Sequence, residues 1–236
     1  MRLFTQPLFG AAPVLNPAPQ LNSRAVSWKI SAPAVAAALV MLPVFVQAPW
    51  VRSSPLACAL FTAVLVALGL RLRGDLGALL IGFSGSWLAG AMFWGWLRLH
   101  PLWHLPIEAF ALPLAIAGLQ GPWRRAGQFY LGALIGTACT DAATALCGLM
   151  PLWPQVLQAS PSEAPLLLSA AAEQVLQPAS LAVVGGFAAA MACAGRWLWR
   201  QGEGGKVVAA ALLSTLAVDA LFLALALLSP QLSGLV

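Results

Sequence analysis

Apolar runs of about twenty residues follow one another through most of this chain. The clearest of them, Val207–Leu228, contains a single charged side chain, that of Asp219. A helix that crosses a bilayer needs ~20 consecutive and mostly apolar residues, whereas a surface helix of a soluble protein is apolar along one stripe only. The repeated runs therefore predict an all-α fold: a polytopic helical membrane protein whose first partner is the lipid bilayer.

The composition excludes two other classes of protein. Apolar side chains make up 61% of the sequence and charged ones 8%, whereas a soluble domain is ~45–50% apolar and ~25% charged. An ordinary soluble enzyme and a disordered chain are both excluded. The sequence is basic, with a pI of about 9.6, but Lys and Arg are scattered singly or in pairs instead of forming a patch, so no nucleic-acid partner is expected.

Seven segments are long and apolar enough to be read as transmembrane spans, with ends uncertain by a few residues. They are Ile30–Trp50, Ser54–Leu70, Leu76–Leu97, Pro101–Leu119, Gln128–Met150, Ser180–Trp197 and Val207–Leu228. Between the fifth and sixth, Glu163–Gln177 is too short for a span and predicts an interfacial helix. Residues 1–29 are expected to form a mobile cytoplasmic tail, and residues 30–236 a single helical transmembrane domain.

The charges predict the orientation, because short cytoplasmic loops of membrane proteins are enriched in Lys and Arg. With the N terminus in the cytoplasm, ten basic residues fall on the inner side: Arg2, Arg24, Lys29, Arg71, Arg73, Arg124, Arg125, Arg196, Arg200 and Lys206. Only Arg52 and Arg98 fall on the outer side. We therefore expect a cytoplasmic N terminus and a C terminus on the opposite side.

Three carboxylates lie inside the expected spans: Glu108, Asp141 and Asp219. At a rise of ~1.5 Å per residue, each lies about 9–13 Å from the outer end of its helix. A charged side chain at membrane depth costs several kcal/mol and therefore usually faces the interior of the bundle. The common depth predicts one polar site in the outer half of the bundle. The alternative is that each acid is neutral and bonded to threonines of its own helix, such as Thr140 beside Asp141.

His104 precedes Glu108 by one helical turn, so the two side chains share a helix face. The first interpretation is an interfacial histidine that is hydrogen-bonded to a carbonyl or to Glu108. The second is that the pair holds a proton or a polar group of a solute at the mouth of the site. A metal ion or the magnesium of a chlorophyll is the weakest one, because no dense ligand motif surrounds the pair. Pro113, five residues further on, predicts a kink that frees the carbonyl of Ala109.

Small residues recur every four positions in the third and fifth spans. They are Gly82, Ser86 and Gly90 in the third, and Gly132, Gly136, Thr140, Thr144 and Gly148 in the fifth. Such ridges allow close approach of helix backbones in a membrane. We therefore expect these two spans at the centre of the bundle.

Two stretches resemble a known family. GFSGSWLAGAMFWGWLRLHPLWHLP at Gly82–Pro106 and YLGALIGTACTD at Tyr130–Asp141 are similar to a cyanobacterial family of small multi-pass membrane proteins, a domain of unknown function. The likeness covers roughly residues 41–154. It implies a cyanobacterial thylakoid or plasma membrane, and it brings no activity with it.

Two functional hypotheses follow. In the first, the chain is a transporter or solute-binding membrane component whose site uses Glu108, Asp141, Asp219 and His104 for a cation, a proton or a small solute. In the second, it is a non-catalytic assembly or accessory factor that contacts subunits of photosynthetic membrane complexes. A third possibility, an intramembrane enzyme, is not supported, because the sequence shows no nucleophile accompanied by a general base. No catalytic residue and no metal site are therefore expected, and no cofactor is identified.

Overall fold

The computed structural model describes residues 31–232, and the tail expected at residues 1–29 lies outside them. Every regular element among the described residues is helical. The α-helices are α1 (Ala32–Leu42), α2 (Ala48–Ser53), α3 (Pro55–Arg71), α4 (Asp75–Met92), α5 (His104–Glu108), α6 (Leu112–Gly118), α7 (Arg124–Leu146), α8 (Leu152–Gln158), α9 (Ala164–Val175), α10 (Pro178–Trp199) and α11 (Gly202–Leu228). Short π-helical segments η1 (Pro43–Gln47) and η2 (Phe93–Leu97) and 3₁₀ turns η3 (Pro101–Trp103) and η4 (Pro230–Leu232) complete the list.

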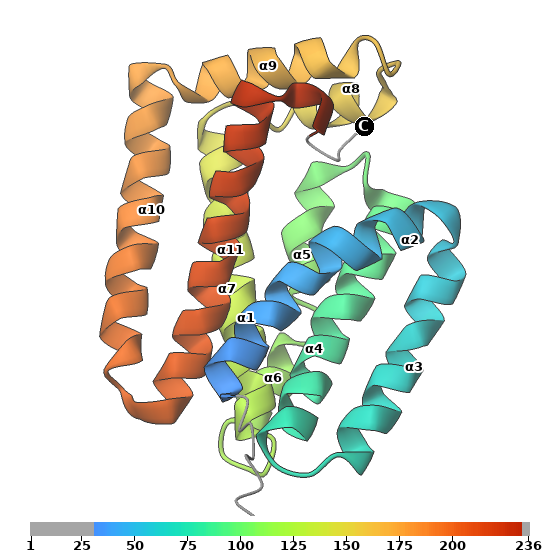
Figure 1. The fold of residues 1–236 in the computed structure, drawn as a ribbon, viewed down its shortest axis with the longest axis vertical. Helices are drawn as coiled ribbons and strands as arrows, with labels where there is room; N and C mark the ends of the chain where they lie inside the picture. Colours follow the sequence, from blue (N-terminus) through green and yellow to red (C-terminus); the bar gives the residue numbers. More distant parts are fainter. Residues whose placement is uncertain (1–30, 233–236) are drawn as a thin grey trace, which may run out of the picture.

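The long helices run side by side along the bundle, and α9 lies across one end of it (Figure 1). The segment α1–η1–α2 crosses the other helices obliquely. At the place of the expected interfacial helix, α9 turns Ala164, Leu168, Ala172 and Val175 inward and leaves Glu173 exposed. The spacing of these buried residues is that of a helix with one apolar stripe.

Five helical segments are long and apolar enough to cross a membrane: Ala32–Ser53, Asp75–Leu97, Arg124–Leu146, Pro178–Trp199 and Gly202–Leu228. Within the most apolar 18 residues of each segment, 61% of the residues are buried in Asp75–Leu97 and 33% in Arg124–Leu146, against 11–17% in the other three. The expectation that the third and fifth spans form the centre of the bundle is therefore confirmed. The second expected span is the shorter apolar helix α3, and the fourth is not a single helix.

The expected span at 101–119 breaks into η3, α5 and α6, and the break lies one residue away from where Pro113 predicts it. The carbonyl of Ala109 is not free, because it accepts the N–H of Leu112 at 3.0 Å. The backbone groups without a helical partner are instead the carbonyl of Glu108 and the N–H of Ala111. Both bind the hydroxyl of Tyr130 on α7, which donates to Glu108 and accepts from Ala111 at 3.2 Å. A side chain of another helix thus replaces the missing helical bonds.

The small residues of α7 form a seam with α11. A Cβ atom at Gly132 would lie 2.7 Å from the carbonyl oxygen of Val208, and one at Gly136 would lie 2.6 Å from Oγ1 of Thr215. The absence of side chains at these two positions therefore permits the observed approach.

The small residues of α4 do not face a single neighbour. Gly82 packs on the backbone of Ala126 in α7, whereas Gly90 packs on the side-chain amide of Gln47 in η1. The amide Nε2 of Gln47 in turn donates to the carbonyl of Trp87. The ridge expected on this helix therefore divides between two contacts.

Lys and Arg side chains are distributed unevenly between the two ends of the bundle. Seven of the nine in residues 31–232 lie at the end opposite α9, here called the basic end: Arg71, Arg73, Arg124, Arg125, Arg196, Arg200 and Lys206 (Figure 1). Arg125 Nε lies 3.2 Å from Oδ1 of Asp75, which joins the first turns of α7 and α4 there. Arg52 and Arg98 lie at the α9 end.

Candidate functional site

A polar contact inside the bundle joins His104 of α5 to Asp141 of α7. Nδ1 of His104 lies 2.9 Å from Oδ1 and 3.1 Å from Oδ2 of Asp141. The two side chains are 16% and 10% exposed, so little water reaches the pair. A carboxylate that accepts from Nδ1–H leaves Nε2 as the proton acceptor of the ring.

An aromatic cage holds the imidazole of His104 in this orientation. The ring centroids of Phe93, Trp153 and Trp94 lie 4.5, 5.9 and 6.5 Å from that of His104. Trp94 and Trp153 stack on each other with an interplanar angle of 22°. Trp153 is itself anchored by its indole N–H, which donates to the carbonyl of Arg98 at 2.9 Å. The cage restricts the ring and reduces its access to water.

Glu108 lies on α5, one turn beyond His104, and is within electrostatic range of both His104 and Asp141. Its backbone carbonyl is the one that Tyr130 holds at the helix break. The break and the acid are thus parts of one arrangement: the hydroxyl that compensates the broken helix also positions the residue that carries the carboxylate.

Asp219 on α11 reaches the same region of α7 from a different side. Thr140 Oγ1 donates to Oδ2 of Asp219 at 2.6 Å, and Asp219 is within electrostatic range of Asp141. Adjacent residues of a helix point about 100° apart. Thr140 and Asp141 therefore direct two polar contacts to neighbouring faces of α7.

The expectation that threonines satisfy the acids within their own helices does not describe these contacts. Thr140 binds Asp219 across the seam, and Thr144 and Thr215 donate instead to the backbone carbonyls of Thr140 and Ala211. The partner of Asp141 is likewise on another helix, since it is His104. Three separate elements, α5, α7 and α11, therefore depend on one another for their polar contacts.

A cavity of about 420 Å³ opens beside Asp219. Its walls come from η2, α7, α8, α9, α10 and α11, and apolar side chains dominate them. Asp219 and Thr140 are among the lining residues, whereas His104, Glu108 and Asp141 are not. The structure thus brings His104 and Asp141 into contact, with Glu108 in electrostatic range of both, and places the fourth predicted residue, Asp219, at a largely apolar cavity.

Within residues 31–232, no group of three or more His, Cys, Asp or Glu side chains is arranged to hold a metal ion. The cluster combines one imidazole with a carboxylate in hydrogen-bond contact and a second in electrostatic range, which is chemistry suited to a proton. Sequence reasoning missed the roles of Tyr130 and Trp153. Tyr130 is the only tyrosine of the chain and lies in an otherwise apolar stretch, which was the one signal available.

Comparison with known proteins gives one match. Searches of curated proteins and of solved structures returned no match. A family model described as "Protein of unknown function (DUF3120)" matches residues 36–227, a longer stretch than the resemblance at residues 41–154. Since the match covers most of the sequence, the chain belongs to this family of unknown function.

Proposed function

We propose that this protein is a non-catalytic solute-binding or transport component of a membrane, in which the His104–Asp141 pair holds a proton. The observation that carries the proposal is the contact itself: an imidazole and a carboxylate 2.9 Å apart, supplied by two elements and shielded by aromatic rings. Glu108 and Asp219 lie within electrostatic range of this pair or of its carboxylate. Ionisable groups at membrane depth usually belong to such pathways.

The cost of charge at membrane depth links proton binding to structure. With the ring protonated, the imidazolium and the Asp141 carboxylate compensate each other; with the ring neutral, the carboxylate keeps only a hydrogen bond. The change in charge at His104 acts electrostatically on Glu108, and the change in the charge balance of Asp141 acts on Asp219. Proton binding at His104 therefore alters the field at the cavity.

The cavity indicates the class of solute. A single carboxylate among apolar walls suits a small amphiphile with a cationic or hydroxylated head, because the head pairs with Asp219 and the remainder replaces water against apolar side chains. Trp94 and Trp153 line the same cavity and offer aromatic faces to a cation.

The proposal includes the orientation and the location. We place the basic end in the cytoplasm, with the broken segment 101–119 and the short helix α3 completing seven passes through the bilayer. The unequal distribution of Lys and Arg supports this orientation. A cyanobacterial thylakoid or plasma membrane is the location that the sequence resemblance implies.

Proton movement can be measured in liposomes that contain the purified protein and an internal pH-sensitive dye. We expect a proton flux in response to an imposed pH gradient, and its loss in Asp141→Asn and His104→Gln. Asp75→Asn removes an exposed carboxylate at the basic end and serves as the control that keeps the flux. A flux unchanged by both site variants would overturn the proton site.

Solute binding is tested with benzyltrimethylammonium as the probe, by its effect on thermal stability in detergent. The probe should raise the Tm of the wild type and leave that of Asp219→Asn unchanged. A protein that shows neither flux nor stabilisation, and that co-purifies with a photosynthetic complex from native membranes, would favour the accessory role instead.

A further inference from the structure

We propose that a second cavity, at the α9 end of the bundle, binds an anionic phospholipid whose phosphate is held by Arg52 and Arg98. This cavity measures about 320 Å³, and its walls come from η1, α2, η2, α8 and α11. The proposal does not depend on the proton site, since no predicted site residue lines this cavity.

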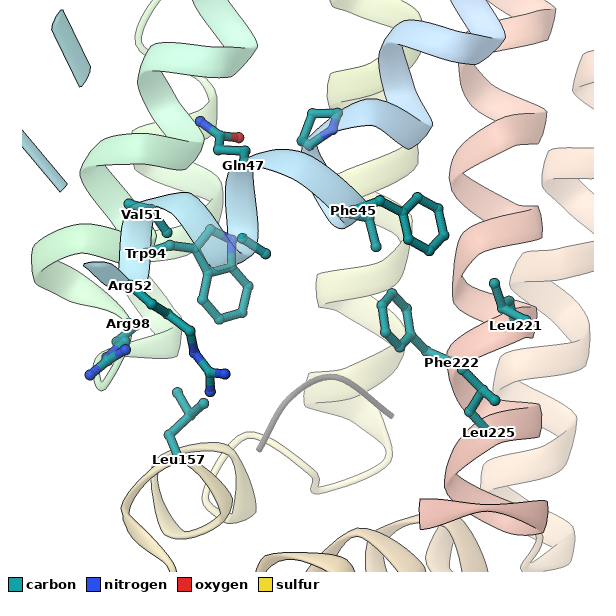
Figure 2. Close-up of a pocket in the computed structure, with 13 residues that line it drawn as sticks. Phe45, Gln47, Val51, Arg52, Trp94, Arg98, Leu157, Leu221, Phe222 and Leu225 are labelled. Atoms are coloured by element: carbon teal, nitrogen blue, oxygen red, sulfur yellow. The ribbon is translucent and has the colours of Figure 1, made fainter. Parts of the chain in front are cut away.

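The cavity is an apolar chamber with two cationic groups. Figure 2 shows Phe45 and Phe222 facing one another on one side, and Arg52 and Arg98 on the other side near Trp94. Apart from these arginines and Gln47, the lining side chains are apolar or aromatic. Among the described residues, Arg52 and Arg98 are the only charged ones that line the cavity, so they are the groups suited to an anion. An acyl chain fits such walls, and the volume lies within the ~300–1,000 Å³ typical of ligand pockets.

The two arginines come from separate elements, so it is the fold that places both at one cavity. Arg52 is in the last turn of α2, and Arg98 directly follows η2. Planar guanidinium groups bind phosphate oxygens with paired hydrogen bonds, which gives them a preference for phosphate over other acceptors. Two of them beside one cavity therefore form a recognisable anion site with an apolar extension.

Arg52 and Arg98 lie at the opposite end of the bundle from the other described Lys and Arg side chains. The other Lys and Arg side chains of residues 31–232 lie at the basic end, where the bias of membrane proteins toward cytoplasmic positive charge accounts for them. That bias does not account for Arg52 and Arg98. The two exceptions to it line the same cavity, and a bound anion gives both of them a common reason.

The bilayer is the source of the ligand because the cavity reaches the outer surface of the bundle. Phe45, one of its walls, is 60% exposed, and the neighbouring Val46 is 45% exposed. In a membrane this apolar surface faces acyl chains. A lipid chain can therefore enter from the side while its phosphate stays at the level of the arginines, near the ends of α2 and η2.

The test compares two lipids with identical acyl chains, phosphatidylglycerol and phosphatidylcholine, added to the purified protein in neutral detergent. Phosphatidylglycerol should raise the Tm and should remain bound in native mass spectra, with phosphatidylcholine clearly weaker in both. In the double variant Arg52→Gln/Arg98→Gln, the apparent Kd for phosphatidylglycerol should rise by about tenfold. Inorganic phosphate alone should not change the Tm, because it lacks the acyl chain.

Two further variants separate binding from folding. Arg71→Gln/Arg73→Gln removes the same charge at the basic end and should keep the preference for phosphatidylglycerol. Leu225 lines this cavity and not that beside Asp219, so Leu225→Trp narrows the apolar chamber, keeps both arginines, and should weaken binding of both lipids. Equal binding of the two lipids by the wild type, or an unchanged preference in Arg52→Gln/Arg98→Gln, would overturn the proposal. A lower Tm of Arg52→Gln/Arg98→Gln with unchanged lipid binding would also overturn it, because the arginines would then stabilise the ends of α2 and η2 instead of binding lipid.

Discussion

At the scale of single residues, the hydroxyl of Tyr130 forms hydrogen bonds with two backbone groups at the break between α5 and α6. Tyr130→Phe keeps the ring and leaves the carbonyl of Glu108 and the N–H of Ala111 without this partner. An unsatisfied buried polar group costs about 1–3 kcal/mol. We expect a clear decrease of Tm in detergent.

The matched control for Tyr130 is Thr62, whose buried hydroxyl has no hydrogen-bond partner in the described structure. Thr62→Val removes an oxygen that makes no bond, so its Tm should equal or exceed that of the wild type. Equal Tm values for Tyr130→Phe and the wild type would mean that water or a local rearrangement supplies hydrogen-bond partners for the two backbone groups at the break.

At the scale of helices, the seam between α7 and α11 determines how the polar contacts meet. In Gly136→Leu, the first added atom would lie 2.6 Å from Thr215 Oγ1, so the helices must separate. Overpacking of this kind costs about 1–3 kcal/mol, and it also withdraws Thr140 from Asp219. Gly185→Leu on α10 meets nothing within 4 Å and should leave the Tm unchanged. Similar Tm values for the two variants would place the seam elsewhere.

The start of α9 provides a pH-dependent element outside the expected spans. Hydrogen bonds from the Ser160 hydroxyl at 2.7 Å and backbone N–H at 3.2 Å lower the pKa of Glu163 from its usual value. Because the folded-state pKa is lowered, the stabilisation is present above the unfolded-state pKa and is lost as the pH falls through the folded-state value. Protection of the amides in the first turn of α9, measured relative to their intrinsic exchange rates, should therefore decrease in acid.

Glu163→Gln is the control for this pH dependence. It should exchange at one rate, relative to the intrinsic chemical rate, at neutral and acidic pH. The wild type should approach that rate only in acid. Wild-type protection that does not change over this range would contradict the role of the Glu163 carboxylate.

At the scale of the whole molecule, hydropathy was enough to locate the five longest apolar segments, but it could not predict the break in residues 101–119 or the contacts between distant residues. Long apolar runs and small-residue ridges predicted these five segments and the central position of α4 and α7, since both depend on local patterns. The exact break in 101–119 depends on the hydroxyl of Tyr130, and the seam joins Thr140 to Asp219 across 79 positions. The depth estimate placed the three acids at one level in the membrane. It contained no information about the direction in which each side chain points around its helix axis.

The orientation of the molecule in its membrane is the last prediction. Moving the basic end out of the cytoplasm would leave seven of the nine described Lys and Arg residues on the disfavoured side, so we expect that end to be cytoplasmic. With the native cysteines replaced and the protein expressed in a plasma membrane, Ser53→Cys and Ser162→Cys at the α9 end should react with an impermeant maleimide in intact cells. Leu72→Cys and Gln201→Cys at the basic end should react only after permeabilisation. The reverse pattern would invert the orientation, and labelling of both Ser162→Cys and Gln201→Cys from outside would mean that α10 does not cross the membrane.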